Sequence, residues 1–201
     1  MASPRFAPAG LLVEFGRRRL MLDGGEAAAP HGSIAAWLVT DEQAELMPAI
    51  RRAARTAGVI PKVASYRCAG LVCRPLPVVH TSHPTYGYLL ETSAGTAAWA
   101  PEFLRFPSWA EGVDLLFAEA AGWNRPIRFR GGVGGHAAAL DVARDAQQAH
   151  VRRLVFAHLG RPTLRAIDAG LRPPFGEFGL EGDVFYLSPS GRIQRKRAVS
   201  V

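Results

Sequence analysis

The sequence predicts a single layered domain of mixed α/β or α+β class, and three observations lead to that prediction. Short apolar stretches come in two groups, and each group is followed by helical patterns. Hydrophobic residues make up 48% of the 201 residues and charged residues 20%, a balance that suits a globular protein. This length allows one full core, so we expect one domain over residues 1–201, ending in a loop, hairpin and basic tail over residues 171–201.

The first half of the chain predicts three strands and a helix. Residues 11–22 read as two strands joined by a tight turn, and residues 34–40 as a third strand. Pro48 fits the first turn of a helix, where its missing N–H costs nothing, so we expect a helix from Met47 to Gly58. Residues 41–45 are then a loop between strand and helix.

The second half predicts more strands, two helices and a final hairpin. The strands are expected at residues 71–79, 85–92, 95–100, 115–120 and 151–158. The stretch GGVGG leads into a helix from His136 to Ala149, which has an apolar face. A short helix at 163–169 and a hairpin around SPSG complete the chain. Cys68 and Cys73 are expected on opposite faces of a strand pair, which argues against a disulfide or a thiolate metal site.

Charge and hydropathy indicate the kind of partner and the compartment. The net charge of +7 and pI near 10.2 suit an anionic partner. The arginines are largely scattered and no recognised nucleic-acid module accompanies them, so nucleic acid is not the favoured partner. No apolar run approaches the roughly 20 residues of a membrane helix, and the amino terminus lacks a signal-peptide core. We expect a cytoplasmic protein with no membrane role; the sequence does not indicate an oligomeric state.

Histidines at the ends of predicted elements are the candidate functional residues. His80, His83, His136 and His158 lie where layered folds usually build their sites. Each one taken alone could equally be a surface or hydrogen-bonded structural histidine. Together with acids elsewhere in the chain they form a set of the kind that binds zinc, manganese or iron. The acids of this set are Glu102, Asp114 and Glu119.

His136 has a separate argument. It follows GGVGG and is expected to open a helix, where free N–H groups and the helix dipole favour an anion. A histidine beside a bound anion is well placed to protonate a leaving group. The alternative is that GGVGG is a flexible connection, because a Gly-rich loop without the full phosphate-loop pattern is weak evidence.

Read in order, these pieces resemble the metallo-β-lactamase superfamily, and especially the phosphodiesterase branch that includes the tRNA-maturing endonuclease RNase Z. The resemblance spans about residues 11–170. MLDGG is similar to the first motif, with Asp23 as its aspartate, and VVHTSHPTYGYLLE resembles the third, with His80 as the metal histidine. WAPEF follows where a bridging aspartate is usual, and Glu102 is the nearest acid.

The later part of the chain carries the closest likeness. DLLFAEA consists of Asp114 and the expected strand 115–120, and it resembles the strand with a His-Glu-Ala-Thr sequence, although Ala118 replaces its histidine and only Glu119 and Ala120 remain. GGHAAALDVARDAQQAHVRRLVFAHLG resembles a catalytic-loop histidine, a helix and a final metal histidine. The resemblance gives those two roles to His136 and His158.

One motif departs from the family pattern. The H-x-H-x-D-H metal motif is expected between the strand ending at Thr40 and the next helix, and this sequence has DEQAEL there. Its histidines are missing. The family's third- and fifth-motif histidines serve different ions about 3.5–4 Å apart, so His80 and His158 do not automatically enclose one ion. The candidate replacement ligands are Asp41, Glu42, Glu45 and His83.

The resemblance therefore implies an αββα sandwich, an α+β fold, with an altered site. Normal dinuclear zinc is not expected; a single zinc or manganese ion would be held by His80, Glu102 and His158, with His136 and Glu119 as catalytic residues. We expect a hydrolase of a phosphodiester or small anionic ester. The alternative is a non-catalytic relative that binds a ligand or a partner. His80, His136 and His158 should converge at one edge of the sandwich.

Overall fold

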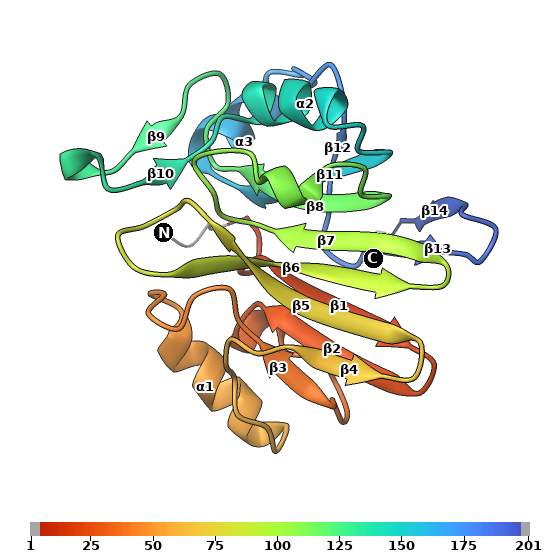
Figure 1. Cartoon of the computed structure of the whole chain (residues 1–201). Coiled ribbons are helices and arrows are strands. Elements are labelled where there is room, and N and C mark those ends of the chain that lie inside the picture. The colour runs from red at the N-terminus through yellow and green to blue at the C-terminus, as the bar shows by residue number, and fades with distance from the viewer. Residues whose placement is uncertain (1–4, 198–201) are drawn as a thin grey trace.

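The computed structural model describes residues 5–197, in which the chain stacks four layers (Figure 1). Helix α1 (Met47–Thr56) covers a three-stranded sheet, which packs on a seven-stranded sheet. Helices α2 (Ala139–Gln148) and α3 (Arg161–Asp168) cover the other face of the large sheet. This is the predicted αββα sandwich. No helix in the described part of the chain is long and apolar enough to cross a membrane.

The small sheet comes from the start of the chain. Strands β1 (Gly10–Phe15) and β2 (Arg18–Asp23) form the expected hairpin, and β3 (Ala36–Leu38) pairs parallel to β2. A short 3-10 turn, η1 (Glu26–Ala28), lies between β2 and β3. Helix α1 begins with Pro in its first turn, as predicted, and ends at Thr56, two residues before the expected Gly58.

The large sheet has the strand order β12-β11-β8-β7-β6-β5-β4. Its strands are β4 (Tyr66–Cys68), β5 (Leu71–Val78), β6 (Thr85–Thr92), β7 (Gly95–Ala100), β8 (Leu115–Ala120), β11 (Arg153–Leu159) and β12 (Glu177–Phe178). Strands β4 to β7 pair antiparallel, whereas β7, β8, β11 and β12 run parallel. The turn η2 (Ser108–Ala110) precedes β8, and β13 (Val184–Leu187) with β14 (Ile193–Lys196) forms the expected terminal hairpin.

The three spaces between the four layers hold three hydrophobic cores. Leu20 and Leu22 of β2 point between the two sheets, whereas Met21 points to the space under α1. Leu116 of β8 lies under α2, and its neighbour Phe117 lies between the sheets. This alternation follows from the two-residue period of a strand, so a strand buried on both faces needs a continuous apolar run.

The predicted start of the second helix is wrong. His136 does not open a helix: it lies in a two-residue strand, β10 (Gly135–His136), which pairs with β9 (Ile127–Arg128). The turn η3 (Arg130–Gly132) joins them, and α2 begins only at Ala139. The helix dipole therefore gives no anion site at His136.

Two smaller expectations also need correction. Cys68 lies opposite Leu71, and Cys73 opposite Tyr66, in the β4–β5 ladder. Partners across a ladder share a face, so both thiols lie on one face of the sheet; both cysteines are free. Within the expected basic tail, the side chain of Arg195 is largely buried in ion pairs with Glu177 and Asp183.

Candidate metal centre

The candidate site lies where the carboxyl ends of several strands meet. Because β7, β8 and β11 are parallel, and β5 runs in the same direction as β7, their carboxyl ends share one edge of the large sheet. His80 follows β5 and Glu102 follows β7, whereas Glu119 and His158 lie near the ends of β8 and β11. The β9–β10 pair brings His136 to the same edge. The structure thus brings together five of the predicted site residues.

Glu119 is the buried anchor of this edge. Its side chain is fully buried, and both of its oxygens are occupied. Oε2 accepts hydrogen bonds from His136 Nδ1 at 2.8 Å and Phe103 N at 3.1 Å, and Oε1 accepts them from His158 Nδ1 at 3.1 Å and Ala121 N at 2.8 Å. In this arrangement Glu119 holds His136 and His158 in place. Its catalytic role stays a prediction from the resemblance.

The protonation of Glu119 and His158 follows from their contact. Burial disfavours the charged form of Glu119, but the charge of His158 and the two histidine hydrogen bonds outweigh it and bring the pKa of Glu119 to about 2. Burial, the largest single effect, lowers the pKa of His158, but the charge and hydrogen bond of Glu119 and the charge of Glu102 together outweigh it and raise that pKa to about 9. The pair is held as carboxylate and imidazolium at neutral pH.

His80 is oriented from the other side. Its ring is buried, and Nδ1 lies 2.9 Å from the carbonyl oxygen of Gly135. A carbonyl can only accept, so Nδ1 carries the proton and Nε2 is free to bind a ligand. His136 and His158 also donate from Nδ1, in both cases to Glu119, and the imidazolium of His158 carries a second proton on Nε2. This is the arrangement in which a metal-binding histidine is held by a second partner.

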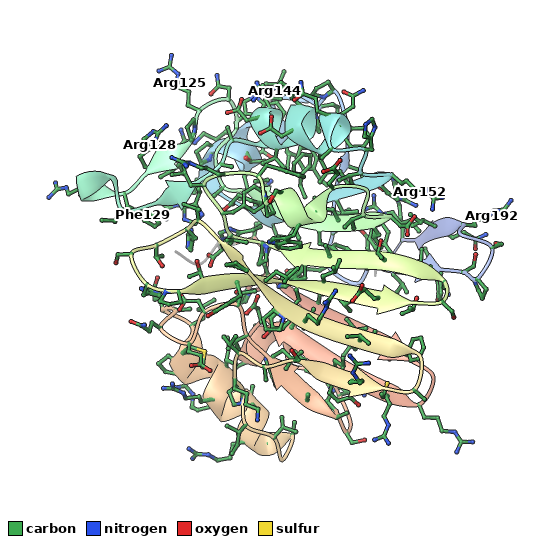
Figure 2. All side chains as sticks on the ribbon, in the orientation of Figure 1. Arg125, Arg128, Phe129, Arg144, Arg152 and Arg192 are labelled. Atoms are coloured by element: carbon green, nitrogen blue, oxygen red, sulfur yellow. The ribbon has the colours of Figure 1, made fainter. Side chains whose placement is uncertain are left out.

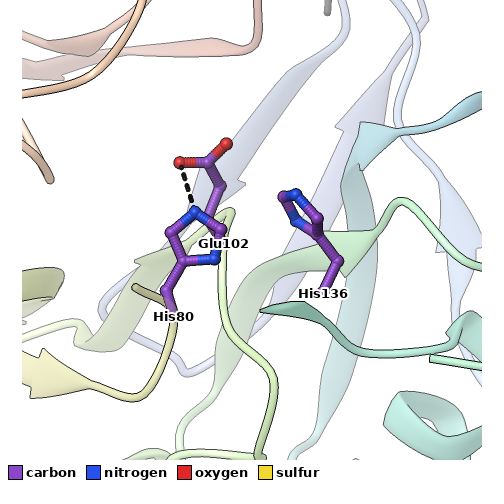
Figure 3. A group of neighbouring side chains, drawn as sticks. All are labelled: His80, Glu102 and His136. Carbon is purple, nitrogen blue, oxygen red and sulfur yellow. Dashed lines mark ion pairs between the residues drawn. The ribbon is translucent and has the colours of Figure 1, made fainter. Parts of the chain in front are cut away.

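Glu102 supplies the carboxylate that faces these Nε2 atoms. Its Oε2 lies 3.5 Å from His80 Nε2, and its Oε1 lies 3.7 Å from His158 Nε2 (Figure 3 shows the first pair). These separations are long for hydrogen bonds. Two ligands at about 2.1 Å from one tetrahedral ion stand about 3.4 Å apart, so the spacing fits a shared metal ion.

Two groups of three side chains have their ligand atoms within 4.8 Å of one another, among the residues described here. One is His80, Glu102 and His136, and the other is Glu119, His136 and His158. The second group is the hydrogen-bonded cluster around Glu119. The expected set of His80, Glu102 and His158 is not one of these groups. Glu102 meets the two histidines with different oxygens.

The loop at 41–46 offers no ligand to this group. Asp41 accepts a hydrogen bond from His83 Nε2 at 2.9 Å on Oδ2 and from Gln43 N at 2.7 Å on Oδ1. Glu42 accepts one from Val63 N at 2.9 Å. Within residues 5–197, neither these acids nor Glu45 belong to a group of three ligands. The proposed replacement ligands Asp41, Glu42 and His83 are instead tied to one another and to backbone.

The same loop borders a surface hollow of about 380 Å³. Its lining residues are Asp41, Glu42, Gln43, Val63, Pro84 and Tyr86. Tyr86 N also donates to Thr40 O at 2.9 Å, which fixes the start of the loop to β6. The hollow adjoins the 41–46 loop, and none of His80, His136 and His158 lines it.

The two supporting aspartates have different positions. Asp23 ends β2 and accepts hydrogen bonds from Thr40 N at 2.7 Å, Thr40 Oγ1 at 2.9 Å and Trp99 Nε1 at 2.6 Å. It thereby ties the two sheets together beside the site. Asp114 does not join the histidine set: it precedes β8 and binds Arg152 and Thr96. Glu119 lies near the other end of that strand.

Sequence reasoning missed the arm formed by β9, η3 and β10. This arm projects from the body (Figure 1), and its Phe129 ring lies 5.5 Å from His80 and 5.4 Å from His136, centroid to centroid. Exposed arginines line it; Figure 2 labels two of them. They are Arg125, Arg128 and Arg130. The sequence did hold a signal for a basic segment here, because no acidic residue occurs between Glu119 and Asp141.

The glycines of GGVGG have a structural reason. A Cβ on Gly134 would lie 1.8 Å from the carbonyl oxygen of His80, and one on Gly135 would lie 2.0 Å from that of Ile127. Gly135 N also donates to His80 O at 2.8 Å. The stretch is therefore a close backbone contact that holds the His80 loop, and not a flexible connection or a phosphate loop.

Comparison with solved structures shows the fold. The metallo-β-lactamase fold protein YhfI from Bacillus subtilis matches with a TM-score of 0.66 at 14% identity, over 88% of this chain and 90% of that one. Human tRNase Z, short form (ELAC1), matches with a TM-score of 0.63 at 12% identity, over 88% and 91%. A diphosphatase of the PhnP family matches with a TM-score of 0.59 at 16% identity, over 85% and 81%.

Sequence comparison adds no closer relative. No protein-family model and no curated protein matches this sequence. The protein has the metallo-β-lactamase fold, and the resemblance predicted from its motifs is confirmed at the level of that fold.

Proposed function

We propose that the protein is a metal-dependent hydrolase with an altered metal site, which acts on a phosphodiester or another small anionic ester. The observation that carries this proposal is the orientation of three histidine rings. Each donates from Nδ1 to a fixed acceptor, so Nε2 is the nitrogen that can take a ligand, once it has given up its proton in the case of His158. Glu102 faces the Nε2 atoms of His80 and His158 at metal-like spacing.

One divalent ion, zinc or manganese, would be held between His80 and Glu102. When bound, such an ion lowers the pKa of a water molecule and polarises the ester that the water attacks. The chain's own residues hold this site rigid. Glu119 fixes the ring planes of His136 and His158, and the Gly135 carbonyl fixes His80.

The arm favours an anionic substrate. Within the described residues, Arg125, Arg128 and Arg130 have no acidic partner, and Phe129 connects the arm to the histidines. Unpaired guanidinium groups beside a site attract phosphate and carboxylate groups. Two structural neighbours are named a diphosphatase and a tRNase, names that fit a phosphate-containing substrate.

The arm can be tested separately from the metal. Combining Arg128→Gln with Arg130→Gln should raise KM for an anionic ester about three- to tenfold, with little change in kcat, because exposed charges act mainly on binding. Arg51→Gln on α1, on the opposite outer layer, is the matched control. An unchanged KM in the double variant would remove the arm from substrate binding.

The second candidate is a non-catalytic protein that binds a ligand or partner. The 41–46 loop favours this second candidate. It has no histidine, and its Asp41 is hydrogen-bonded to His83. Loss of ligands lowers metal affinity directly. This candidate predicts a folded protein that takes up no stoichiometric metal.

Metal analysis with an activity assay separates the two candidates. Protein purified without chelator should contain metal, and added manganese or zinc should support cleavage of a chromogenic phosphodiester. His80→Ala should abolish this cleavage. Less than about a tenth of an equivalent of metal, with no rescue and no turnover, would leave the non-catalytic candidate, because the water has no other evident activator.

A further inference from the structure

We infer that the third protein ligand of the metal ion is His136, so that the ion is held by His80, Glu102 and His136 and not by His80, Glu102 and His158. The inference rests on the proposed function, since it concerns the same ion. It moves His136 from proton transfer to metal binding and gives His158 a positioning role.

Distance is the first argument. The ligand atoms of His80, Glu102 and His136 all lie within 4.8 Å of one another. The ring centroids of His80 and His136 are 4.7 Å apart, and Figure 3 shows both rings beside the Glu102 carboxylate. An ion could bind all three with small movements.

Anchoring is the second argument, and it involves one short strand. In β10, the carbonyl of Gly135 holds His80 Nδ1 at 2.9 Å, and the next residue is His136 itself. The Glu119 carboxylate holds His136 Nδ1 at 2.8 Å. Gly135 therefore sets the orientation of His80, and Glu119 sets that of His136, the next residue of the same strand. A carboxylate bonded to the far nitrogen of a metal-binding histidine also raises its basicity.

Coordination chemistry is the third argument. Two histidines and one carboxylate are three protein ligands, which leave a fourth tetrahedral position for water. This is the composition of a catalytic site and not of a closed structural one. One ground for a proton-transfer role of His136, its place at a helix start, is removed by the structure, in which α2 begins at Ala139. The other ground is the resemblance to a catalytic-loop histidine.

His158 then acts through other residues. Its Nδ1 donates to Glu119 at 3.1 Å, and its Nε2 lies 3.7 Å from Oε1 of Glu102, the oxygen that does not face His80. From this position it steadies the ligand carboxylate. Its loss should disturb the metal site less than loss of a ligand.

The test is a Co²⁺ titration followed by visible absorption and equilibrium dialysis. Wild-type protein should bind about one equivalent of Co²⁺, because the second group of the described residues is already closed by hydrogen bonds from His136 and His158 to the buried Glu119. His136→Ala should weaken binding at least about 100-fold and change the Co²⁺ spectrum. His158→Ala should weaken it about tenfold and keep the spectrum, as expected for an outer-shell partner.

Controls keep the outcome interpretable. His31→Ala replaces an exposed histidine of the η1–β3 connection and should bind Co²⁺ as the wild type does. If His136→Ala fails to fold, the side-chain nitrogen resonances of the wild type serve instead. On Zn²⁺ addition, His136 Nε2 should show the ligand shift, and His158 Nε2 should not.

The outcomes separate this inference from the proposed function. A loss of Co²⁺ binding in His158→Ala but not in His136→Ala would overturn the inference and leave the hydrolase proposal intact. A Zn²⁺ shift at His158 Nε2 but not at His136 would do the same. Wild-type protein that binds no Co²⁺ and shows no turnover would end both.

Discussion

Two groups of polar residues near the same edge of the sandwich are held in different ways. In one group, His80, His136 and His158 each have Nδ1 anchored, which directs Nε2 away from the anchor, and Glu102 faces His80 and His158. In the other group, the 41–46 loop has acids whose oxygens are bound by His83 and by backbone N–H groups. A ligand set therefore depends on how each side chain is anchored as much as on its identity.

The largest expected effect comes from removing the anchor shared by two histidines. Glu119→Ala would leave two imidazoles and two backbone N–H groups without their acceptor in a buried site. We expect a loss of about 3–5 kcal/mol in the free energy of unfolding, measured by chemical denaturation, because breaking a buried charged pair costs that much.

The control for Glu119 lies before the other end of the same strand. Asp114→Ala removes a carboxylate that pairs with the half-exposed Arg152, and it should cost only about 1 kcal/mol. A similar loss in both variants would mean that Glu119 is no more important than an ordinary strand-end acid. Anchoring by Glu119 would then not distinguish the histidine group from the 41–46 loop.

The second prediction tests the backbone contact behind His80. Gly134→Ala should cost about 2–3 kcal/mol, because its Cβ would lie 1.8 Å from the His80 carbonyl oxygen and force backbone to move. It should also weaken metal binding. Gly132→Ala, in open space but at φ +69°, should cost only about 1 kcal/mol and leave the metal site intact. If both variants lost the same unfolding free energy and bound metal equally well, the close contact of Gly134 with the His80 carbonyl would not matter for the site.

The third prediction concerns Asp23, which joins the two regions through Thr40 and Trp99. Burial raises its pKa from 3.8 to about 6, against the opposing effect of these hydrogen bonds. The folded state then binds the proton more tightly than the unfolded state. The stability from this group is full below about pH 3.8 and is lost as pH rises through 6, by about 2–3 kcal/mol.

Asp23→Asn removes this titration. The difference in unfolding free energy between wild type and variant should therefore shift in favour of the variant between pH 4 and pH 7. Because other titrating groups are common to both proteins, they cancel in the difference. A difference that stays constant across this range would show that Asp23 is already ionised at pH 4.

The sequence predicted the layers better than the contacts. Strand positions such as 95–100 and 115–120 were correct, because alternation and turn residues are local signals. The order of motifs also indicated which residues would meet at one edge. The short β9–β10 pair was missed, since two-residue strands have no periodicity, and a helix was extended over His136 in its place.

The pairing of individual atoms could not be predicted from sequence. The contact between Asp41 and His83 joins residues 42 positions apart, and nothing local selects His83 over a metal as the partner of Asp41. Likewise, the sequence could not show that Glu102 meets His80 and His158 with different oxygens. Such choices depend on side-chain geometry that forms only after the sheets have paired.

The smallest expected effect is that of a substitution in the 41–46 loop, which tests whether its acids take no part in metal binding. Asp41→Ala removes the acceptor of His83 Nε2 and Gln43 N, and should cost about 1 kcal/mol in unfolding free energy. Co²⁺ affinity should stay within about twofold of wild type, since Asp41 contacts none of the three clustered ligands. His80→Ala, three residues before His83, should lose binding. A large drop in Co²⁺ affinity in Asp41→Ala would mean that the loop reaches the ion after all, because tied carboxylates can still exchange a histidine for a metal.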